Sequence, residues 1–187
     1  GREFWAYNNA VIEALRRAHR IIVPSQWVAR PIRKDMRCQP AVIPHGIDGD
    51  EFKVPETHGD YVLWAKPRVD VVSDPAPMNK LAMLAPDVPF WSTYGRAAQN
   101  VEVIGVHPHG AFRDILSQSA VYLATTRETG DIASREAMAF GVPVLGWDWG
   151  ATGELIHHKE PGYLARLGDY EDLLEGLRFC LARREKL

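Results

Sequence analysis

The stretch TTRETGDIASREAMAFGVPVLGWDWG, residues 125–150, carries the strongest structural signal in the chain. It begins at the end of an apolar run, VYLATT, which reads as a buried strand. SREAMAF is helical up to Gly141, and VPVLGW is a second buried strand. Two strands joined by a helix predict a parallel pair with a crossover connection. Two glutamates, Glu128 before the helix and Glu136 inside it, are separated by seven residues.

The rest of the chain repeats this alternation of short apolar runs and amphipathic stretches. Asp169 is placed to cap the closing helix, YEDLLEGLRFCLARR, and residues 65–80 read as a loop. Strands that alternate with helices predict an α/β fold, in which a mostly parallel sheet is covered by helices on both faces. The further predicted strands are RIIVP, AVIPHGID, YVLWAK, PFWSTY, VEVIG and GYLA. The further predicted helices are FWAYNNAVIEALRRA, one capped by Ser25 and limited or kinked by Pro31, AFRDILSQSA and a short one from GELIHH.

Composition excludes several classes of function. The 187 residues are 46% apolar and 25% charged, with a net charge of −2, so charge gives no case for binding nucleic acid. The two cysteines, Cys38 and Cys180, lie far apart and form no metal or redox motif. Such sparse cysteine and the lack of a long apolar run favour a cytoplasmic location, with a peripheral contact to a membrane left open.

Ligands of open parallel sheets bind beyond the carboxyl ends of the strands, so the loops there are the candidate site. Four of them carry suitable polar residues: 44–48, 65–70, 105–110 and 125–131. The last enters a helix, whose free N–H groups suit a phosphate, while a carboxylate such as Glu136 can accept hydrogen bonds from a ribose diol. The spacing of the glutamates therefore fits a nucleotide sugar. Taken alone, however, a glutamate before a helix is more often only a favourable charge at the helix start, and a glutamate inside a helix more often lies on a solvated face.

The motif E-x7-E followed by AMAFGVPVLG resembles the donor-binding signature of retaining glycosyltransferases of the GT-B fold, in the large group 1 family. AVIPHGIDGDEF, NVEVIGVHPHGAFRDILSQSAVYLATTRE and GWDWGATGELIHHKEPGYLARLGDYEDLLEGL resemble further family segments, so that the likeness covers roughly residues 41–180. The fold implied is one half of a GT-B protein, a Rossmann-like domain. Residues 39–187 would be the C-terminal, nucleotide-sugar-binding domain, and residues 1–38 the last helix–strand–helix of an N-terminal Rossmann-like domain.

The resemblance also implies roles for individual residues. Glu128 would be the catalytic residue, in contact with the transferred sugar, and Glu136 would bind the ribose hydroxyls. The backbone amides around Gly130, Asp131 and Ile132, at the start of the helix, would also bind the donor. Lys66 and Arg68 would be the two cations at the diphosphate. The backbone groups of Val106 and His107 would lie near the base. Lys80 is a second candidate for the later of the two cations. No metal is expected, because the basic residues and the helix start neutralise the leaving diphosphate, and the pair His107 and His109 alone is a weak zinc motif.

The function implied is transfer of a sugar, with retention, from a nucleotide diphosphate sugar to the hydroxyl of an acceptor sugar, lipid or small molecule. The N-terminal half of the same enzyme would hold the acceptor, so this chain alone should bind donor weakly and catalyse little. One departure from the family lies at Gly130 and Asp131, where an aromatic residue and a glycine are usual. Asp131 would point at sugar hydroxyls, or mark a shifted loop or an altered activity, and Arg135 is placed to pair with it (i, i+4).

Two other functions stay open at this point. A non-catalytic nucleotide- or partner-binding module of the same fold is favoured by Asp131 and by the unusual 65–80 segment. A sugar-nucleotide epimerase of the same fold is the third.

Overall fold

The computed structural model describes residues 2–160 and 162–183, and the chain divides into two compact units at Gly46 and Ile47. The first unit contains α1 (Arg2–Arg17), β1 (Ile22–Val23), α2 (Gln26–Asp35) and β2 (Ala41–Val42). Its two short strands pair in parallel, and the Ser25 hydroxyl caps α2 by accepting from the Val28 N–H. The segment 39–46 thus belongs to this compact unit, and the assignment of residues 1–38 to an N-terminal domain stays a prediction.

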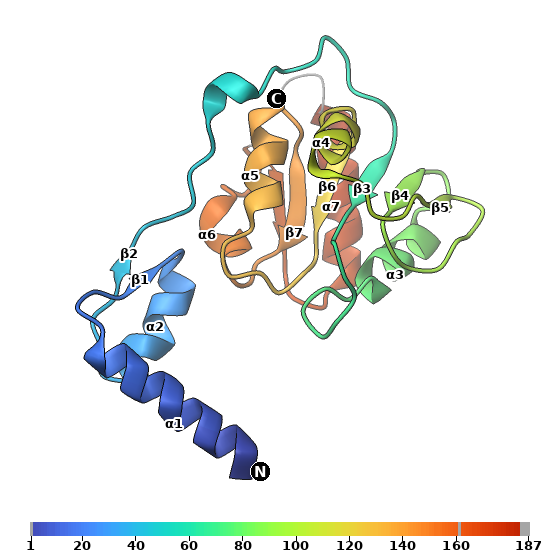
Figure 1. The fold of residues 1–187 in the computed structure, drawn as a ribbon. Helices are drawn as coiled ribbons and strands as arrows, with labels where there is room; N and C mark the ends of the chain where they lie inside the picture. The colour runs from blue at the N-terminus through green and yellow to red at the C-terminus, as the bar shows by residue number, and fades with distance from the viewer. Residues whose placement is uncertain (1, 161, 184–187) are drawn as a thin grey trace. The chain divides into compact units, whose positions relative to one another are not determined.

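A six-stranded parallel sheet forms the centre of the second unit (Figure 1). After the 3₁₀ turn η1 (Gly49–Glu51), the strands run in the spatial order β5-β4-β3-β6-β7-β8, with every pair parallel. The chain builds outward from β3 to β5 and then returns to place β6 on the other side of β3. The order therefore reverses between β3 and β6, which makes the crevice at their carboxyl ends the expected ligand position. The strand bounds are β3 Val62–Trp64, β4 Phe90–Ser92, β5 Val101–Val103, β6 Val121–Ala124, β7 Val144–Trp147 and β8 Gly162–Ala165.

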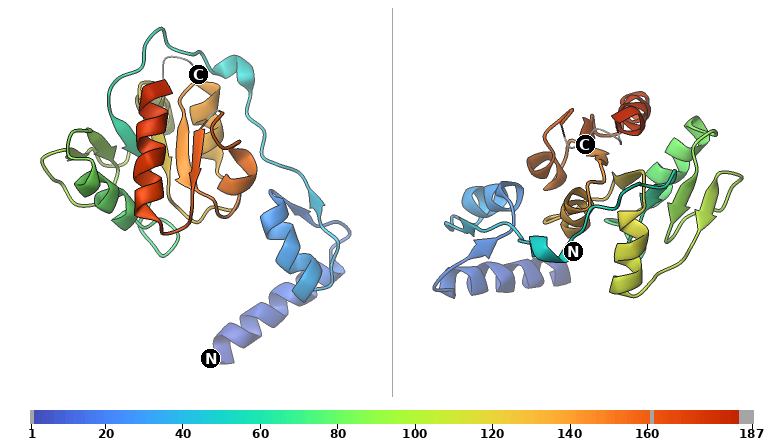
Figure 2. Two further views of the ribbon diagram at one scale, coloured as in Figure 1. Left: turned by 180° about the vertical axis from the view of Figure 1, so that it is seen from behind. Right: turned by 90° about the horizontal axis from the view of Figure 1, so that it is seen from above.

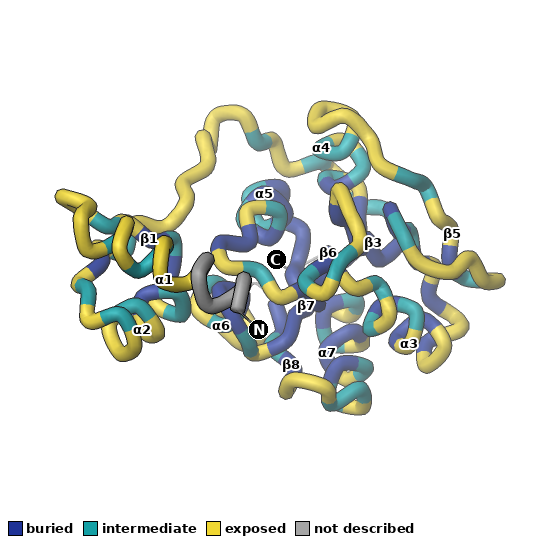
Figure 3. The backbone as a smooth tube through the Cα atoms, turned by 60° about the horizontal axis from the view of Figure 1, so that its bottom comes forward, coloured by how far each residue is buried: buried dark blue, intermediate teal, exposed yellow. Residues whose placement is uncertain are grey.

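Helices cover both faces of this sheet (Figure 2). On one face α3 (Ala76–Leu84) and α7 (Tyr170–Arg183) pack against the strands, and on the other lie α4 (His109–Ser117) and α5 (Ile132–Ala139). α6 (Thr152–Leu155) follows β7. β6 and β7 are buried along their whole lengths (Figure 3), as expected for strands covered on both sides. The predicted α/β fold, a Rossmann-like parallel sheet between helices, is confirmed.

One helix was missed by the sequence reading. Residues 65–80 were expected to be a loop, but α3 begins at Ala76. Two prolines, Pro75 and Pro77, obscure its start, although proline is well tolerated in the first turn of a helix. The cap predicted at the last helix is confirmed, because Asp169 Oδ1 accepts from the N–H groups of Glu171 and Asp172 at 3.1 and 3.0 Å. No helix within the described ranges has both the length and the apolar character needed to cross a bilayer.

Candidate donor site

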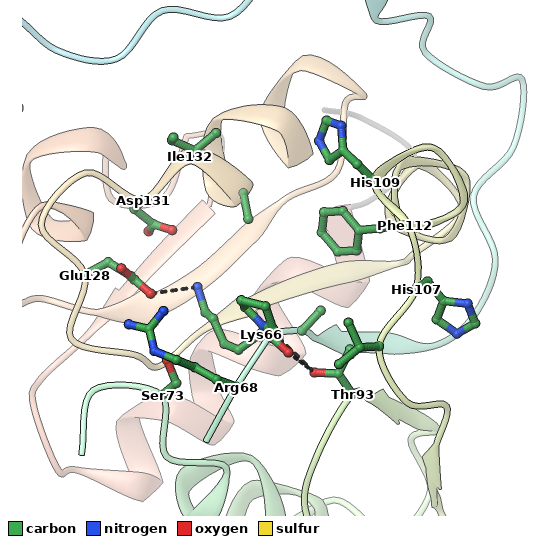
Figure 4. A pocket seen from close by; sticks show the side chains of 14 residues that line it. Lys66, Arg68, Ser73, Thr93, His107, His109, Phe112, Glu128, Asp131 and Ile132 are labelled. Carbon is green, nitrogen blue, oxygen red and sulfur yellow. Dashed lines mark hydrogen bonds and ion pairs between the residues drawn. The ribbon is translucent and has the colours of Figure 1, made fainter. Parts of the chain in front are cut away.

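A cavity of about 390 Å³ opens at the carboxyl ends of the central strands, at the point where the strand order reverses. Its walls come from the loops after β3, β4, β5 and β6, together with the first turns of α4 and α5. Figure 4 shows Lys66, Glu128 and Asp131 on one side and His107, His109 and Phe112 on the other. The lining residues are Ala65, Lys66, Pro67, Arg68, Ser73, Thr93, Val106, His107, His109, Phe112, Glu128, Asp131, Ile132 and Ala133.

A buried ion pair lies in this cavity. The ammonium of Lys66 is 3.2 Å from Glu128 Oε1, and the lysine side chain is only 8% exposed. Burial by itself would lower the pKa of Lys66, but the acidic groups of Tyr122, Asp131 and Glu128 around it raise that pKa above its ordinary value. Lys66 is therefore charged at neutral pH, and its ammonium holds the carboxylate of Glu128 at the cavity.

Thr93, which follows β4, fixes the backbone of Lys66. Its Oγ1 accepts from the Lys66 N–H and donates to the Lys66 carbonyl, both at 2.8 Å. Both residues are buried, so these main-chain groups have little access to water as an alternative partner. Thr93 thus places the start of the loop after β3, from which the lysine side chain enters the cavity.

Replacing Thr93 with valine should lower the free energy of unfolding by about 2 kcal/mol, since it leaves a buried N–H and a buried carbonyl unpaired. Thr93→Ser keeps the hydroxyl and should cost less than about 1 kcal/mol. Urea denaturation of the two variants measures the difference. Equal stability of the valine and serine variants would show that the hydroxyl does not secure this loop.

The second predicted cation, Arg68, is largely exposed and also has a carboxylate partner. Its Nε donates to Asp70 Oδ2, while Asp70 Oδ1 accepts from the N–H groups of Val72 and Ser73 at 2.9 and 2.8 Å. The arginine and these two backbone donors lower the pKa of Asp70 to about 2. Asp70 therefore folds the loop back on itself and holds Arg68 at the rim of the cavity.

The start of α5 forms another wall. Asp131, the residue before the helix, has φ of 45°, in the left-handed region that glycine favours and aspartate tolerates. This conformation accounts for a glycine being usual at this position in the family that the sequence resembles. The Asp131 side chain makes no cap hydrogen bond to the helix, and Ile132 and Ala133, in the first turn whose N–H groups have no partner within the helix, line the cavity.

Two hydroxyls bind the carboxylate of Asp131. Its Oδ2 accepts from Ser134 Oγ at 2.7 Å and from Thr152 Oγ1 at 2.8 Å, whereas its buried Oδ1 has no hydrogen-bond partner among the described residues. The predicted pairing with Arg135 is wrong: no ion pair between the two is found within residues 2–160 and 162–183, and the buried Arg135 Nε is unpartnered. The serine and threonine hydroxyls take the place that the i, i+4 spacing suggested for the arginine.

Glu136 lies one turn further along α5 and is 7% exposed. Its Oε1 is 3.1 Å from Nε2 of His109, the first residue of α4. The imidazole is 69% exposed and stands on the wall opposite Lys66 (Figure 4). A buried carboxylate next to an exposed, displaceable imidazole can exchange that partner for a ligand hydroxyl.

Glu128 is positioned from the neighbouring strand. The Ala151 N–H donates to the Glu128 carbonyl at 3.2 Å, and Gly150 has φ of 68°. A Cβ at Gly150 would come within 2.8 Å of the Glu128 carbonyl oxygen, so only glycine permits this approach. The loop after β7 thereby fixes the main chain that carries Glu128.

Seven of the nine residues predicted from sequence line this one cavity: Lys66, Arg68, Val106, His107, Glu128, Asp131 and Ile132. Glu136 and Gly130 do not line it, although Glu136 reaches it through His109. Lys80 lies elsewhere, with its ammonium 3.7 Å from the centroid of the Tyr170 ring. Their roles in binding stay predictions.

Three polar residues of the cavity had been missed as site residues: Ser73, Thr93 and the histidine that contacts Glu136. No sequence pattern marks Ser73 and Thr93 as site residues, because both contribute through hydrogen bonds that fix the backbone of a loop. His109 could have been found from its position, because it begins a helix at the same edge of the sheet as the other site residues. No group of three or more histidine, cysteine or acidic side chains able to hold a metal occurs in the described part of the chain.

The sequence matches the model of a known protein family. Residues 83–183, more than half of the chain, match the family model described as glycosyl transferases group 1. The chain belongs to this family. The match spans β4 to α7 and therefore includes both glutamates and the loop between them.

Solved structures share the fold of this group 1 glycosyltransferase domain. Sucrose-phosphate synthase from Thermosynechococcus elongatus matches with a TM-score of 0.79 and 19% identity, over 93% of this chain and 52% of that protein. Anabaena HepE in complex with UDP-glucose matches with a TM-score of 0.75 and 18% identity, over 92% and 57%. A mutant of S. aureus TarM, solved with Fondaparinux, alpha-GlcNAc-glycerol and UDP, gives 0.75 and 16%, over 96% and 39%. The chain thus spans about half the length, or less, of these proteins, and a comparison with curated proteins found no match.

Proposed function

We propose that the chain is the donor-binding part of a retaining glycosyltransferase, and that the cavity between β3 and β6 binds a nucleotide diphosphate sugar. The observation that carries this is the grouping of Lys66, Glu128 and the open start of α5 at the switch point of a family domain. Two similar structures were solved with UDP or UDP-glucose, which makes a uridine nucleotide the first candidate.

In this proposal the diphosphate lies against the first turn of α5, near the ammonium of Lys66 and the guanidinium of Arg68. Free N–H groups at a helix start and a buried cation both favour a phosphate. Glu136 exchanges His109 for the ribose diol, and Val106 and His107 face the base. Glu128, next to Lys66, contacts the transferred sugar.

The proposed reaction breaks the bond between the anomeric carbon and the diphosphate oxygen, while the acceptor oxygen bonds to the same face of that carbon. The acceptor proton passes to the leaving diphosphate, whose growing charge Lys66 stabilises. An N-terminal half of the same enzyme, of which residues 1–38 would be the end, supplies most of the acceptor site.

One observation favours the alternative of a non-catalytic nucleotide- or partner-binding module. Lys66 is already paired with Glu128 and Arg68 with Asp70, and the buried Asp131 adds a further carboxylate beside Lys66. A diphosphate would have to share these cations with three acidic side chains. Nucleotide binding without sugar transfer, in the chain joined to its N-terminal half, is the outcome that this alternative predicts.

A thermal-shift panel of UDP-, GDP- and ADP-glucose tests the binding claim. A ligand at about 100 times its dissociation constant stabilises the folded state by about 2.7 kcal/mol. For a protein of this size, that corresponds to a rise in melting temperature of about 5–10 °C. A panel in which no nucleotide sugar raises the melting temperature would contradict the donor site.

A further inference from the structure

A cavity of about 350 Å³ lies in the first compact unit, the part drawn in shades of blue in Figure 1. Two stretches of the chain form its walls. One is residues 15–21, from the last turn of α1 to the residue before β1, and the other is residues 37–41, from the turn after α2 to the first residue of β2. The cavity shares no lining residue with the candidate donor site.

Backbone hydrogen bonds hold these two stretches together. The Ala41 N–H donates to the Ile21 carbonyl at 2.8 Å and aligns the start of β2 with the end of the first stretch. After α2, the Cys38 N–H donates to the Ile32 carbonyl at 3.4 Å, and Arg37 has φ of 55°, in the left-handed region. The chain therefore turns back on itself after α2, which places Arg37 at the cavity.

The walls of this cavity are basic. Arg16, His19, Arg20 and Arg37 line it and are all exposed, and no described residue of the lining is acidic. The dipole of a helix favours a cation in its last turn, which accounts for Arg16 at the end of α1. It does not account for Arg20 and Arg37, which lie beyond the last residues of α1 and α2.

The three arginines of the cavity have no protein partner. Within the described residues, no ion pair or hydrogen bond involves the side chain of Arg16, Arg20 or Arg37, whereas the neighbouring Arg17 pairs with Glu13 at 3.8 Å. Like charges gathered around one cavity repel each other, and a bound anion would relieve this repulsion. The three guanidinium groups are thus available to an anion from solution.

An excess of positive charge extends over the whole first unit. Residues 1–46 contain eight of the 22 basic residues and three of the 24 acidic ones, a net charge of +5. Residues 47–187 carry the opposite excess, a net charge of −7. The basic cavity is therefore not the result of a basic chain, and the field of the first unit attracts anions to it.

We infer that this cavity binds a phosphate group, carried either by a small molecule or by a lipid headgroup. The planar guanidinium group matches two oxygens of a phosphate, which makes arginine the preferred residue for such contacts. A volume of about 350 Å³ lies within the range of small-molecule sites. The inference is independent of the proposed donor site, whose residues all belong to the second unit.

Backbone amide NMR of the 187-residue chain, titrated with inorganic pyrophosphate, tests the inference. Pyrophosphate should shift the signals of residues 15–21 and 37–41, while binding in the donor cavity would be seen separately at residues 65–73 and 128–136. The double variant Arg16→Gln, Arg20→Gln should weaken binding at the first set by about tenfold. The matched control Arg30→Gln, Lys34→Gln removes the same charge from exposed positions of α2 outside the cavity, and its affinity should stay within about twofold of wild type.

The source of the phosphate is distinguished by sedimentation with vesicles of phosphatidylcholine, with and without phosphatidic acid. Binding that requires phosphatidic acid, is lost in the cavity variant and is kept in the control supports a lipid headgroup. Binding of pyrophosphate at the cavity without binding to either vesicle supports a soluble phosphate compound. The inference is overturned if pyrophosphate shifts no signal of residues 15–21 and 37–41 and phosphatidic acid recruits no protein. It is also overturned if the two double variants lose affinity equally, because the attraction would then come from net charge alone.

Discussion

Replacing Lys66 with methionine is expected to lower the free energy of unfolding by about 3 kcal/mol, at the lower end of the roughly 3–5 kcal/mol found when one partner of a buried ion pair is removed. The ammonium pairs with the carboxylate of Glu128 and is influenced by the charge of Asp131, and the lysine side chain is 8% exposed. Without the ammonium, the buried charge of Asp131, whose Oδ1 already has no hydrogen-bond partner within the described residues, loses a favourable interaction with a nearby cation. The lower end applies because Glu128 is 29% exposed and can regain some hydration. The same variant should lose nucleotide-sugar binding.

A second substitution and a matched control separate charge from packing. In the Lys66→Met, Glu128→Gln double variant one of the uncompensated charges is gone, so part of the lost stability should return. Arg68→Met removes the exposed cation of the same loop and should change stability little. Chemical denaturation measures all three. Equal losses for the Lys66 and Arg68 variants would show that the buried pair does not secure the site.

The effect of pH gives a further check on this pair. The pKa of Lys66 is raised in the folded state. Its stabilising contribution is therefore complete below the ordinary lysine pKa and is lost only as the pH rises through the raised value. Between about pH 6 and 9 the stability difference between wild type and Lys66→Met should stay constant.

Glu136→Ala is expected to weaken the binding of bare UDP, or of whichever nucleotide binds, by about 10- to 150-fold. The estimate follows from the roughly 1.5–3 kcal/mol of a hydrogen bond to a charged group. Its partner His109 is 69% exposed and can turn to water, so the folded state should lose little stability. Isothermal titration calorimetry on the chain measures the affinity.

Glu128→Gln is the contrasting variant. Its amide oxygen can still accept from Lys66, and bare-nucleotide affinity should change little. Turnover of the chain joined to its N-terminal half should fall by about 100- to 1,000-fold, as when one stabilising group of a reaction centre is removed. Equal losses of bare-nucleotide affinity in the Glu136 and Glu128 variants would contradict the roles assigned to the two glutamates.

Periodicity and loop position predicted most of the fold and much of the cavity. The parallel sheet follows from alternating apolar runs and helices, and the loops after β3 and β6 meet because the carboxyl ends of neighbouring parallel strands share one edge. α3 was not predicted, because Pro75 and Pro77 obscure its start. The partners of Asp131 were unpredictable for a different reason: Thr152 lies 21 residues away, and only the packing of α6 brings its hydroxyl to the carboxylate.

The contact between Glu136 and His109 shows the same limit. The two residues are 27 positions apart on different helices, and no local pattern links them. Sequence spacing indicates which residues share a sheet edge, whereas the pairing of individual side chains depends on how the helices pack.

Backbone amide NMR of the chain, titrated in turn with UDP-, GDP- and ADP-glucose, tests the central claim most directly. The account predicts that one of them shifts the signals of residues 65–73, 105–109 and 128–136, the three segments around the cavity that holds Lys66 and Glu128. If none of them shifts these signals, or if the shifts fall outside these segments, the cavity is not a nucleotide-sugar site.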